Sequence, residues 1–279
     1  YSLPSGTPIF DLPHESRVLS AAFGPRKELL ATGSANKTAR TWDLRRGRPI
    51  HTFTGHFGRV VDVAISPQGQ FLGTASSDDT ARIWDIAIKG GDLMAIPTGH
   101  RDQLRTIEFS PRGLYVLTSS RDGTARVWNT DRGNEVAVLA GHIGDVRGAV
   151  FSTTGRRVLT YGEDGTARIW DPGTTAELRV LSDRPARLTG LDVADDGRVR
   201  VTTDENGVAR VWSPGRGKKP VVLPTRGVRN ARLSPNADSV AIAAGKRVAR
   251  IWSTEGVPEL EFPTRDRVNV VAFSPDGRT

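Results

Sequence analysis

The chain has 279 residues, of which 37% are hydrophobic, and it contains no cysteine. These values fit one large domain or two ordinary ones, and they exclude a disulfide framework and thiolate chemistry. No stretch approaches 18 consecutive apolar residues, so the sequence predicts no transmembrane helix.

The charge and the start of the chain set further expectations. The net charge is +8, and 33 of the 39 basic residues are arginine. No charged-then-apolar leader stands at the start, so no signal peptide is predicted and a cytoplasmic location is expected. Because the chain opens at Tyr1 and has a single methionine, Met94, we expect it to be a segment of a longer protein.

From its first residues onward, the chain is predicted to form short strands separated by turns. Residues 7–13 read TPIFDLP and match the predicted strand RPIHTFT at 48–54. Around Trp128 the predicted strands are LRTIEFS, LYVLTSS, TARVWN and EVAVLA. SPRG and SRDG form the turns between them, because Pro, Asp and Gly supply the backbone angles that turns need. The chain ends on another predicted strand and turn, RVNVVAFSPDGRT at 267–279.

Six tryptophans mark an internal repeat. Their spacings are 42, 44, 42, 42 and 40 residues, and each closes a similar phrase, from TARTWD to VARIWS. A Gly-His pair lies 28 residues before three of them, and Ser-Pro follows the first strand of four units. A period of this length predicts a β-propeller. The tryptophans are Trp42, Trp84, Trp128, Trp170, Trp212 and Trp252.

The phrase, the Gly-His pairs and the Ser-Pro turns together resemble the WD-repeat family over essentially the whole chain. The resemblance implies an all-β propeller of four-stranded antiparallel blades, each taking its outer strand from residues just past a tryptophan. We therefore predict a single domain over 1–279 with seven blades, the seventh incomplete in this chain. Residues 267–279 would start that blade, and residues 7–13 would supply the outer strand that closes it.

In this family, a tryptophan, a Ser or Thr, a histidine and an aspartate form a hydrogen-bonded chain inside a blade. A His, a hydroxyl and an Asp could also form a catalytic triad. The set recurs in three blades and always uses Thr, so we expect a structural network, no catalytic residue, no metal and no cofactor. The expected members are His56, Thr74, Asp78 and Trp84; His100, Thr118, Asp122 and Trp128; and His142, Thr160, Asp164 and Trp170.

The resemblance also implies that the first residues of each innermost strand face the narrow mouth of the central channel, where partners are held. Two such positions per blade give an arginine in every blade. The arginines either bind an acidic partner or pair with neighbouring carboxylates, and the sequence leaves both readings open. The predicted partner-binding residues are Arg17, Arg59, Gln103, Arg105, Asp145, Arg147, Arg187, Arg229 and Arg267.

Three functions follow in order of expectation. The first is a non-catalytic interaction or sensor platform in a larger bacterial protein, which holds an acidic protein segment or restrains an attached effector domain. The second is nucleic-acid binding, which the charge favours but the 6% aromatic content does not. The third is a propeller enzyme, for which the mouth offers only Asp145 as an acid. No membrane and no small-molecule substrate is expected.

Overall fold

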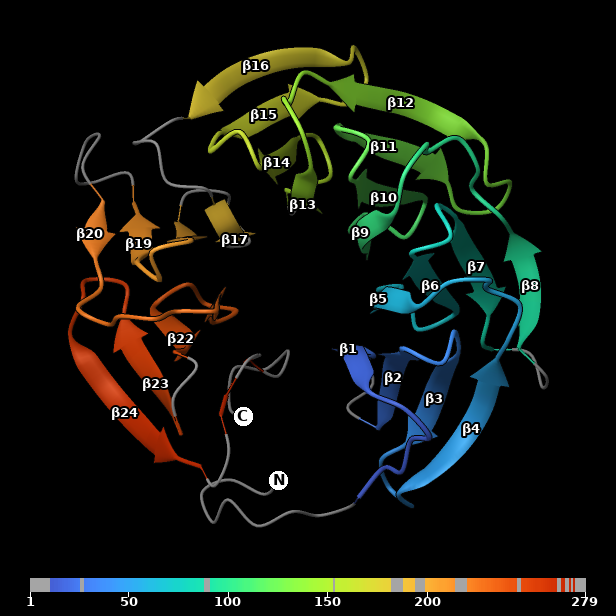
Figure 1. Cartoon of the computed structure of the whole chain (residues 1–279), viewed down its shortest axis with the longest axis horizontal. Helices are drawn as coiled ribbons and strands as arrows, with labels where there is room; N and C mark the ends of the chain where they lie inside the picture. Colours follow the sequence, from blue (N-terminus) through green and yellow to red (C-terminus); the bar gives the residue numbers. More distant parts are fainter. Residues whose placement is uncertain are drawn as a thin grey trace.

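The computed structural model describes residues 11–25, 28–87, 91–152, 154–181, 188–193, 199–213, 220–244, 247–264, 267–268, 271 and 273. These residues form six four-stranded antiparallel sheets arranged as blades around a central axis (Figure 1). In each sheet the strands lie side by side in chain order, from the innermost to the outermost. The protein is therefore an all-β propeller, as the repeat predicted.

The blades are numbered in chain order, and each holds four consecutive strands. Blades one to three contain β1 (Val18–Phe23), β2 (Leu29–Ser34), β3 (Ala39–Asp43), β4 (Arg48–Phe53), β5 (Val60–Ile65), β6 (Phe71–Ser76), β7 (Ala81–Asp85), β8 (Asp92–Ala95), β9 (Leu104–Phe109), β10 (Tyr115–Ser120), β11 (Thr124–Asn129) and β12 (Glu135–Ala140). Blades four to six contain β13 (Val146–Phe151), β14 (Val158–Gly162), β15 (Ala167–Asp171), β16 (Ala176–Leu181), β17 (Leu188–Val193), β18 (Arg200–Asp204), β19 (Ala209–Trp212), β20 (Val221–Val222), β21 (Asn230–Leu233), β22 (Ser239–Ala243), β23 (Val248–Ser253) and β24 (Pro258–Pro263).

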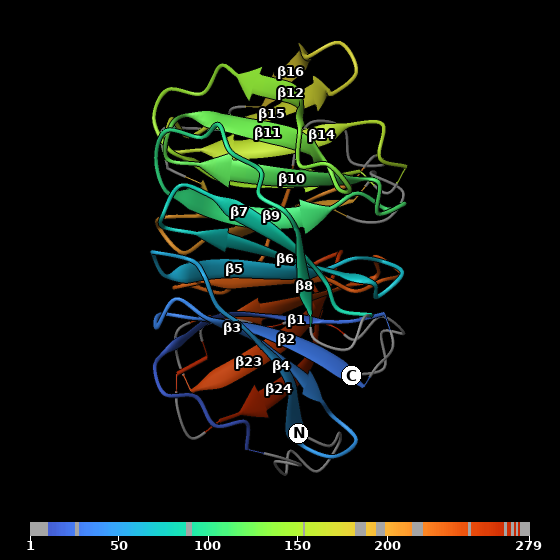
Figure 2. The ribbon, with the colours of Figure 1, turned by 90° about the vertical axis from the view of Figure 1, so that its right-hand side faces the viewer.

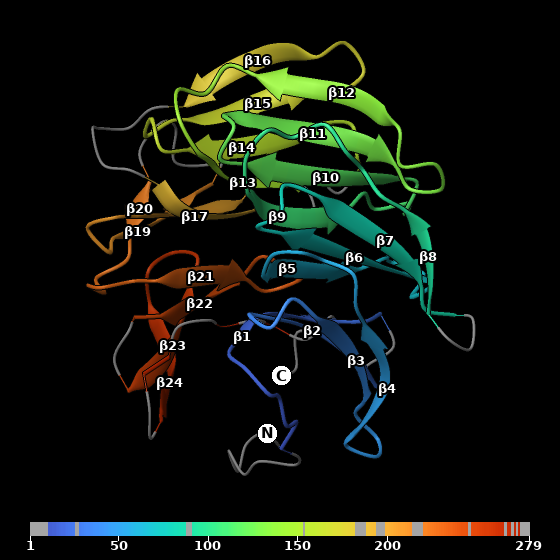
Figure 3. The same ribbon diagram turned by 45° about the vertical axis from the view of Figure 1, so that its right-hand side comes forward.

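The strands run between the two faces of the ring (Figure 2), and the blades stack against one another around it (Figure 3). Stacking buries both faces of the blades that have a described neighbour on each side. The repeat tryptophan supplies much of this contact, since it packs against the blade before its own. Trp84 joins the core of blade one, Trp128 that of blade two, Trp170 that of blade three and Trp252 that of blade five.

The Ser-Pro turns close the first hairpin of a blade through the serine hydroxyl. Ser66 Oγ accepts the Phe71 N–H at 3.0 Å, and Ser110 Oγ accepts the Tyr115 N–H at 3.1 Å. Ser234 does the same in blade six, where its Oγ accepts the Ser239 N–H at 3.0 Å. Proline then fixes the backbone angle at the next position, which explains why this pair recurs at the same place in the repeat.

The Gly of each Gly-His pair is required by a close approach. Gly99 has a φ of +154°, and a Cβ there would lie 2.8 Å from Nη1 of Arg126. Gly141 is similarly placed, because a Cβ would lie 2.9 Å from Nη1 of Arg168. The arginine two residues before the tryptophan therefore packs over this glycine, and a larger residue would displace it.

Two expected elements fall mostly outside the described residues. Of the predicted closing strand at 7–13, only residues 11–13 are described, and these three are not in a strand. Of 267–279, only 267, 268, 271 and 273 are described. No described strand lies in the sector between blade six and blade one (Figure 1).

Candidate functional site

The His-Thr-Asp-Trp side chains predicted for blades two to four lie within hydrogen-bonding distance of one another. In blade three, His100 Nδ1 lies 2.8 Å from Asp122 Oδ2, and His100 Nε2 lies 2.8 Å from Thr118 Oγ1. The Trp128 indole N–H donates to the same Thr118 oxygen at 2.8 Å. Equivalent contacts of 2.7–3.1 Å link His56, Thr74, Asp78 and Trp84 in blade two and His142, Thr160, Asp164 and Trp170 in blade four.

In blade four the electrostatics of this network favour an ionised aspartate and a neutral histidine. Burial alone would raise the pKa of Asp164, but hydrogen bonds from the Thr166 N–H, His142 and the Ile143 N–H lower it to about 2. Burial lowers the pKa of His142, against the opposing effect of Asp164. A neutral imidazole can donate from Nδ1 to the carboxylate and accept the threonine proton at Nε2. Both nitrogens of His142 and the indole N–H of Trp170 then have a partner within the network.

The network changes in the other blades, and the residues that replace its members explain how. In blade one, Asn36 stands at the position of the aspartate. His14 Nε2 lies 2.8 Å from Thr32 Oγ1, but His14 Nδ1 contacts the Leu12 carbonyl, at 2.8 Å, instead of Asn36. Blade five retains the Trp212 bond to Thr202 at 3.1 Å. In blade six, the Trp252 indole N–H is buried without a partner, since Ile242 stands where the other blades have threonine.

Two of the mouth arginines form ion pairs with carboxylates from the neighbouring blade or turn. Arg105 holds Asp145 of the next blade with Nε at 3.0 Å and Nη2 at 2.6 Å from Oδ2. Arg147 Nη2 lies 3.2 Å from Glu163 Oε1. Gln103 is half-buried, and Asp145 is buried at 5% exposure. These positions therefore brace the rim, as the local-pairing reading expects.

The other described mouth arginines are free. Arg17, Arg59, Arg229 and Arg267 are exposed, and among the described residues no carboxylate lies within ion-pair distance of their side chains. Arg187 lies outside the described residues. Arg17 and Arg59 directly precede β1 and β5, so both stand at the end of the channel where the innermost strands begin. Their backbones are fixed by the adjacent turns, since the Arg59 N–H donates to Ser77 Oγ at 2.9 Å.

The channel wall carries acidic side chains that the sequence analysis did not single out. Asp62 Oδ2 accepts the Ile107 N–H from the next blade at 3.0 Å. Glu108 Oε2 accepts the Phe151 N–H at 3.0 Å, and Asp192 Oδ2 accepts the Leu233 N–H at 2.8 Å. Each carboxylate therefore links its innermost strand to the following one. In the sequence, these carboxylates could have been found as single acidic residues within otherwise apolar strands, as in VVDVAI.

These channel groups influence one another's charge. Burial raises the pKa of Glu108 to about 8, the Phe151 N–H and Arg232 oppose this shift, and Asp192 and Asp62 add to it. Arg232 Nη1 lies 3.6 Å from Asp192 Oδ1. The ring of Tyr161 lies over Gly148 of β13, where a Cβ would overlap it. No group of His, Asp or Glu among the described residues is arranged to hold a metal ion.

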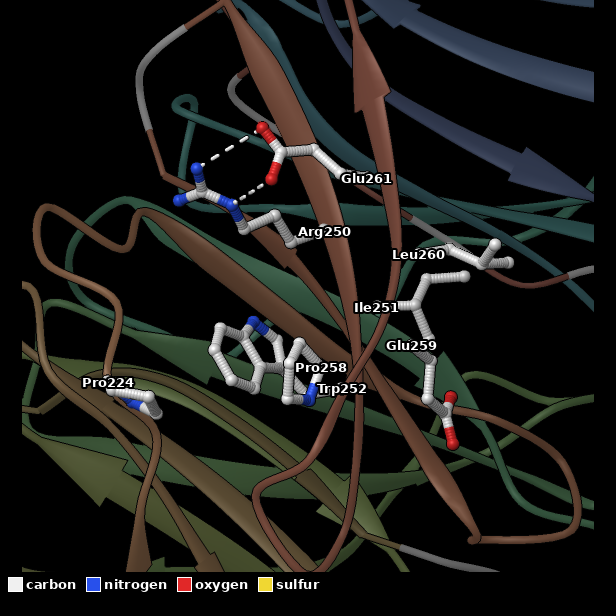
Figure 4. Close-up of a pocket in the computed structure, with 8 residues that line it drawn as sticks. All are labelled: Pro224, Arg250, Ile251, Trp252, Pro258, Glu259, Leu260 and Glu261. Atoms are coloured by element: carbon white, nitrogen blue, oxygen red, sulfur yellow. Dashed lines mark hydrogen bonds and ion pairs between the residues drawn. The ribbon is translucent and has the colours of Figure 1, made fainter.

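A groove lies on the outer rim, away from the channel. Figure 4 shows the Trp252 indole in this groove with Pro224 and Pro258 around it and Arg250 bound to Glu261. The Arg250 Nε lies 3.0 Å from Glu261 Oε2, and Glu259, the third charged residue of the groove, accepts the Ser239 hydroxyl at 2.7 Å. Among the described residues, no helix is long and apolar enough to cross a membrane.

Comparison with known proteins places the chain in a family. A search of curated proteins returned no match. The model of the WD domain, G-beta repeat matches residues 6–43, 47–85, 91–129 and 133–171, which together cover more than half of the chain. Each matched segment ends one residue after a repeat tryptophan. It therefore contains the three inner strands of that blade and excludes the blade's own outer strand, which follows the tryptophan. Members of this family are generally non-catalytic scaffolds for protein interaction, and this chain belongs to the WD40 repeat family.

Proposed function

We propose that this propeller is a sensor or interaction platform within a larger bacterial protein, and that its channel mouth binds an acidic protein segment. The bound segment belongs either to a partner or to an effector domain of the same protein that the propeller restrains. The free mouth arginines, Arg17, Arg59, Arg229 and Arg267, carry this proposal, because they are exposed and have no carboxylate partner in the part of the chain that the structure describes.

The chemistry of guanidinium groups supports an acidic ligand. A guanidinium binds a carboxylate in a planar, two-pronged manner and remains charged at all physiological pH values. Several such groups around one opening repel each other unless anions lie between them. The net charge of +8 also attracts acidic partners from a distance, and added salt weakens that attraction.

A complete ring would hold these arginines in a closed circle, and one contact supports a seventh blade. The Val271 N–H donates to Asn230 Oδ1 at 3.1 Å. The same kind of bond joins earlier neighbouring blades, where the Ile107 N–H donates to Asp62 at 3.0 Å. We therefore propose that the chain at residue 271 takes the innermost position of a seventh blade, with residues 7–13 as its outer strand and the whole chain as one domain.

The channel carboxylates do not favour a propeller enzyme. An oxygen of each of Asp62, Glu108 and Asp192 accepts a backbone N–H from the next blade. This is a structural task, and in our proposal none of these groups, nor any member of the His-Thr-Asp-Trp network, acts in catalysis. We propose that the protein needs no cofactor and no small-molecule substrate, and that it acts in the cytoplasm.

A charge-reversal experiment tests the proposal. The variant combines Arg17→Glu, Arg59→Glu and Arg229→Glu, and leaves Arg105 and Arg147 in place because their loss would expose Asp145 and Glu163. The matched control combines Arg112→Glu, Arg132→Glu and Arg156→Glu, which lie in the turns between β9 and β10, β11 and β12, and β13 and β14, at the opposite ends of the strands.

Binding is measured with a fluorescent peptide of alternating Glu and Gly and with a single-stranded oligonucleotide, at low and high salt. We expect the mouth variant to lose the peptide and the control to retain it. Equal binding by both variants would refute the mouth as the site. Binding of the oligonucleotide alone would favour the second candidate, nucleic-acid recognition through the same arginines.

A further inference from the structure

The residue directly after the histidine has the same setting in blades two, three and four. It is Phe57, Arg101 and Ile143, respectively. Its backbone N–H donates to the aspartate of the network, at 2.7 Å for Phe57, 3.1 Å for Arg101 and 3.1 Å for Ile143. The aspartate that holds the buried histidine therefore also fixes this backbone, and the side chain beyond it is exposed.

Two of these side chains are far more exposed than the other large apolar residues that the structure describes. Phe57 is 82% exposed and Ile143 is 80% exposed, whereas the next values are 58% for Val257 and Leu260. The loops that carry them are firmly held. A Cβ at Gly58 would lie 2.6 Å from the backbone N of Asp78, so this loop lies tight against the neighbouring turn. Apolar side chains presented from a fixed backbone are preorganised to be covered by a partner.

The charge around these two side chains selects the kind of partner. Arg101 stands at the equivalent position in blade three, between blades two and four, and it is exposed. Arg59 lies two residues from Phe57 and is also exposed. Among the described residues, two acids near this row have no ion pair, Asp102 next to Arg101 and Asp79 of the neighbouring turn, whereas Asp145 near Ile143 is bound by Arg105. Three exposed arginines, Arg59, Arg101 and Arg121, outnumber these two acids, so this edge has a positive excess that complements an acidic partner.

We propose that Phe57, Arg101 and Ile143 form an anchoring row that docks a protein segment in which acidic residues are flanked by apolar ones. The apolar side chains of the segment cover Phe57 and Ile143, and an acidic side chain between them binds Arg101. The inference rests on the proposed function and refines it, because it adds apolar contacts and confines them to blades two to four. Blade one has Glu15 at this position, which is paired with Arg40 and offers no apolar side chain.

The test separates the apolar row from the mouth arginines. The double variant Phe57→Ser and Ile143→Ser removes the apolar side chains and leaves every charge in place. The matched control is Val257→Ser with Leu260→Ser, which removes exposed apolar side chains from the rim of blade six. Two peptides of equal length and charge serve as probes. One alternates Glu with Gly, and the other replaces some of the glycines with Leu and Phe.

We expect the wild-type protein to bind the Leu- and Phe-containing peptide about tenfold more tightly than the Glu-Gly peptide. The Phe57→Ser, Ile143→Ser variant should lose this advantage and bind both peptides alike, while the rim control keeps it. Equal affinity of the wild type for both peptides would overturn the anchoring row and leave the proposed function intact. Failure of the wild type to bind either peptide would overturn the proposed function itself.

Discussion

Replacement of Asp122 by alanine tests whether the buried network stabilises the propeller. Asp122 accepts four hydrogen bonds, from His100 Nδ1 at 2.8 Å, the Arg101 N–H at 3.1 Å, the Thr124 N–H at 2.9 Å and the Thr124 hydroxyl at 2.7 Å. Arg101 is exposed and Thr124 is half-buried, so water can replace the carboxylate for both. The His100 side chain is only 2% exposed, and its Nδ1–H would keep only a long contact of 3.4 Å to the Thr124 hydroxyl.

The expected cost follows from that one buried donor, which is left without a short hydrogen bond. A buried polar group without a partner costs on the order of 1–3 kcal/mol, so Asp122→Ala should lower the free energy of unfolding by this amount. The matched control is Asn36→Ala at the same position of blade one. Asn36 accepts bonds only from Thr38, at 3.3 Å and 2.7 Å, and His14 uses the Leu12 carbonyl instead. No histidine is stranded there, so the cost should stay below about 1 kcal/mol.

Urea denaturation followed by circular dichroism measures both changes. The decrease in the free energy of unfolding that Asp122→Ala causes should also depend on pH. Burial opposes ionisation of Asp122, but hydrogen bonds from His100 and Thr124 hold its pKa well below the usual range. A carboxyl group whose pKa is lower in the folded than in the unfolded protein stabilises the fold at pH values above its unfolded pKa, near 4. This contribution disappears as the pH falls. The gap between wild type and Asp122→Ala should therefore narrow below about pH 4. Equal costs for Asp122→Ala and Asn36→Ala would refute the reasoning.

Three further expectations concern other parts of the ring. Hydrogen exchange should be slower in blades two to four than over 187–279, where the network is incomplete, and equal or greater protection in the latter would contradict this. Because the pKa of Glu108 is raised to about 8, the folded state holds a proton that the unfolded state has lost between about pH 4.5 and 8, so stability should fall as the pH rises through that window. Glu108→Gln keeps an acceptor for the Phe151 N–H but cannot titrate. In urea titrations between pH 6 and 9, it should remove about 1–3 kcal/mol of the decrease in unfolding free energy, which is less than the full pKa shift implies because solvent screens the charge. Gly148→Ala should lower the melting temperature, since the new methyl group meets Tyr161, and Gly148→Ala with Tyr161→Ser should recover part of the loss.

Much of the architecture was predictable because the repeat imposes the same local constraints each time. The spacing of the tryptophans sets the phase of the blades, and Thr118, Asp122 and His100 stand 10, 6 and 28 residues before Trp128, offsets that the other complete blades share. The family model matches the first four repeats, and blades five and six, which it does not match, are the blades that lack the histidine. In those blades the strands still form, because strand pairing and the apolar contacts between blades do not depend on the network.

The state of the mouth arginines was not predictable, because it depends on contacts between blades. Position alone could not separate Arg105, which binds Asp145 from the next blade, from Arg59, which has no such partner. The channel acids were missed for a related reason. Asp62 is the third residue of its strand, whereas Glu108 and Asp192 are the fifth of theirs, so no fixed spacing marks them. Their common task, binding the N–H of the following blade, is visible only in three dimensions.

In our proposal, the network links stability to recognition in blades two to four. Its aspartate must be ionised and buried to hold the histidine, and the same oxygen fixes the N–H of the next residue at Phe57, Arg101 and Ile143. In a blade without the histidine, the aspartate has no buried imidazole to bind. In a blade without the aspartate, the loop lacks the hydrogen bond that fixes its backbone N–H. In blade five, Asn206 stands at the position of this aspartate, after Glu205. The side chains that meet a partner should thus be most precisely placed where the buried network is complete, which makes one half of the ring the better recognition surface.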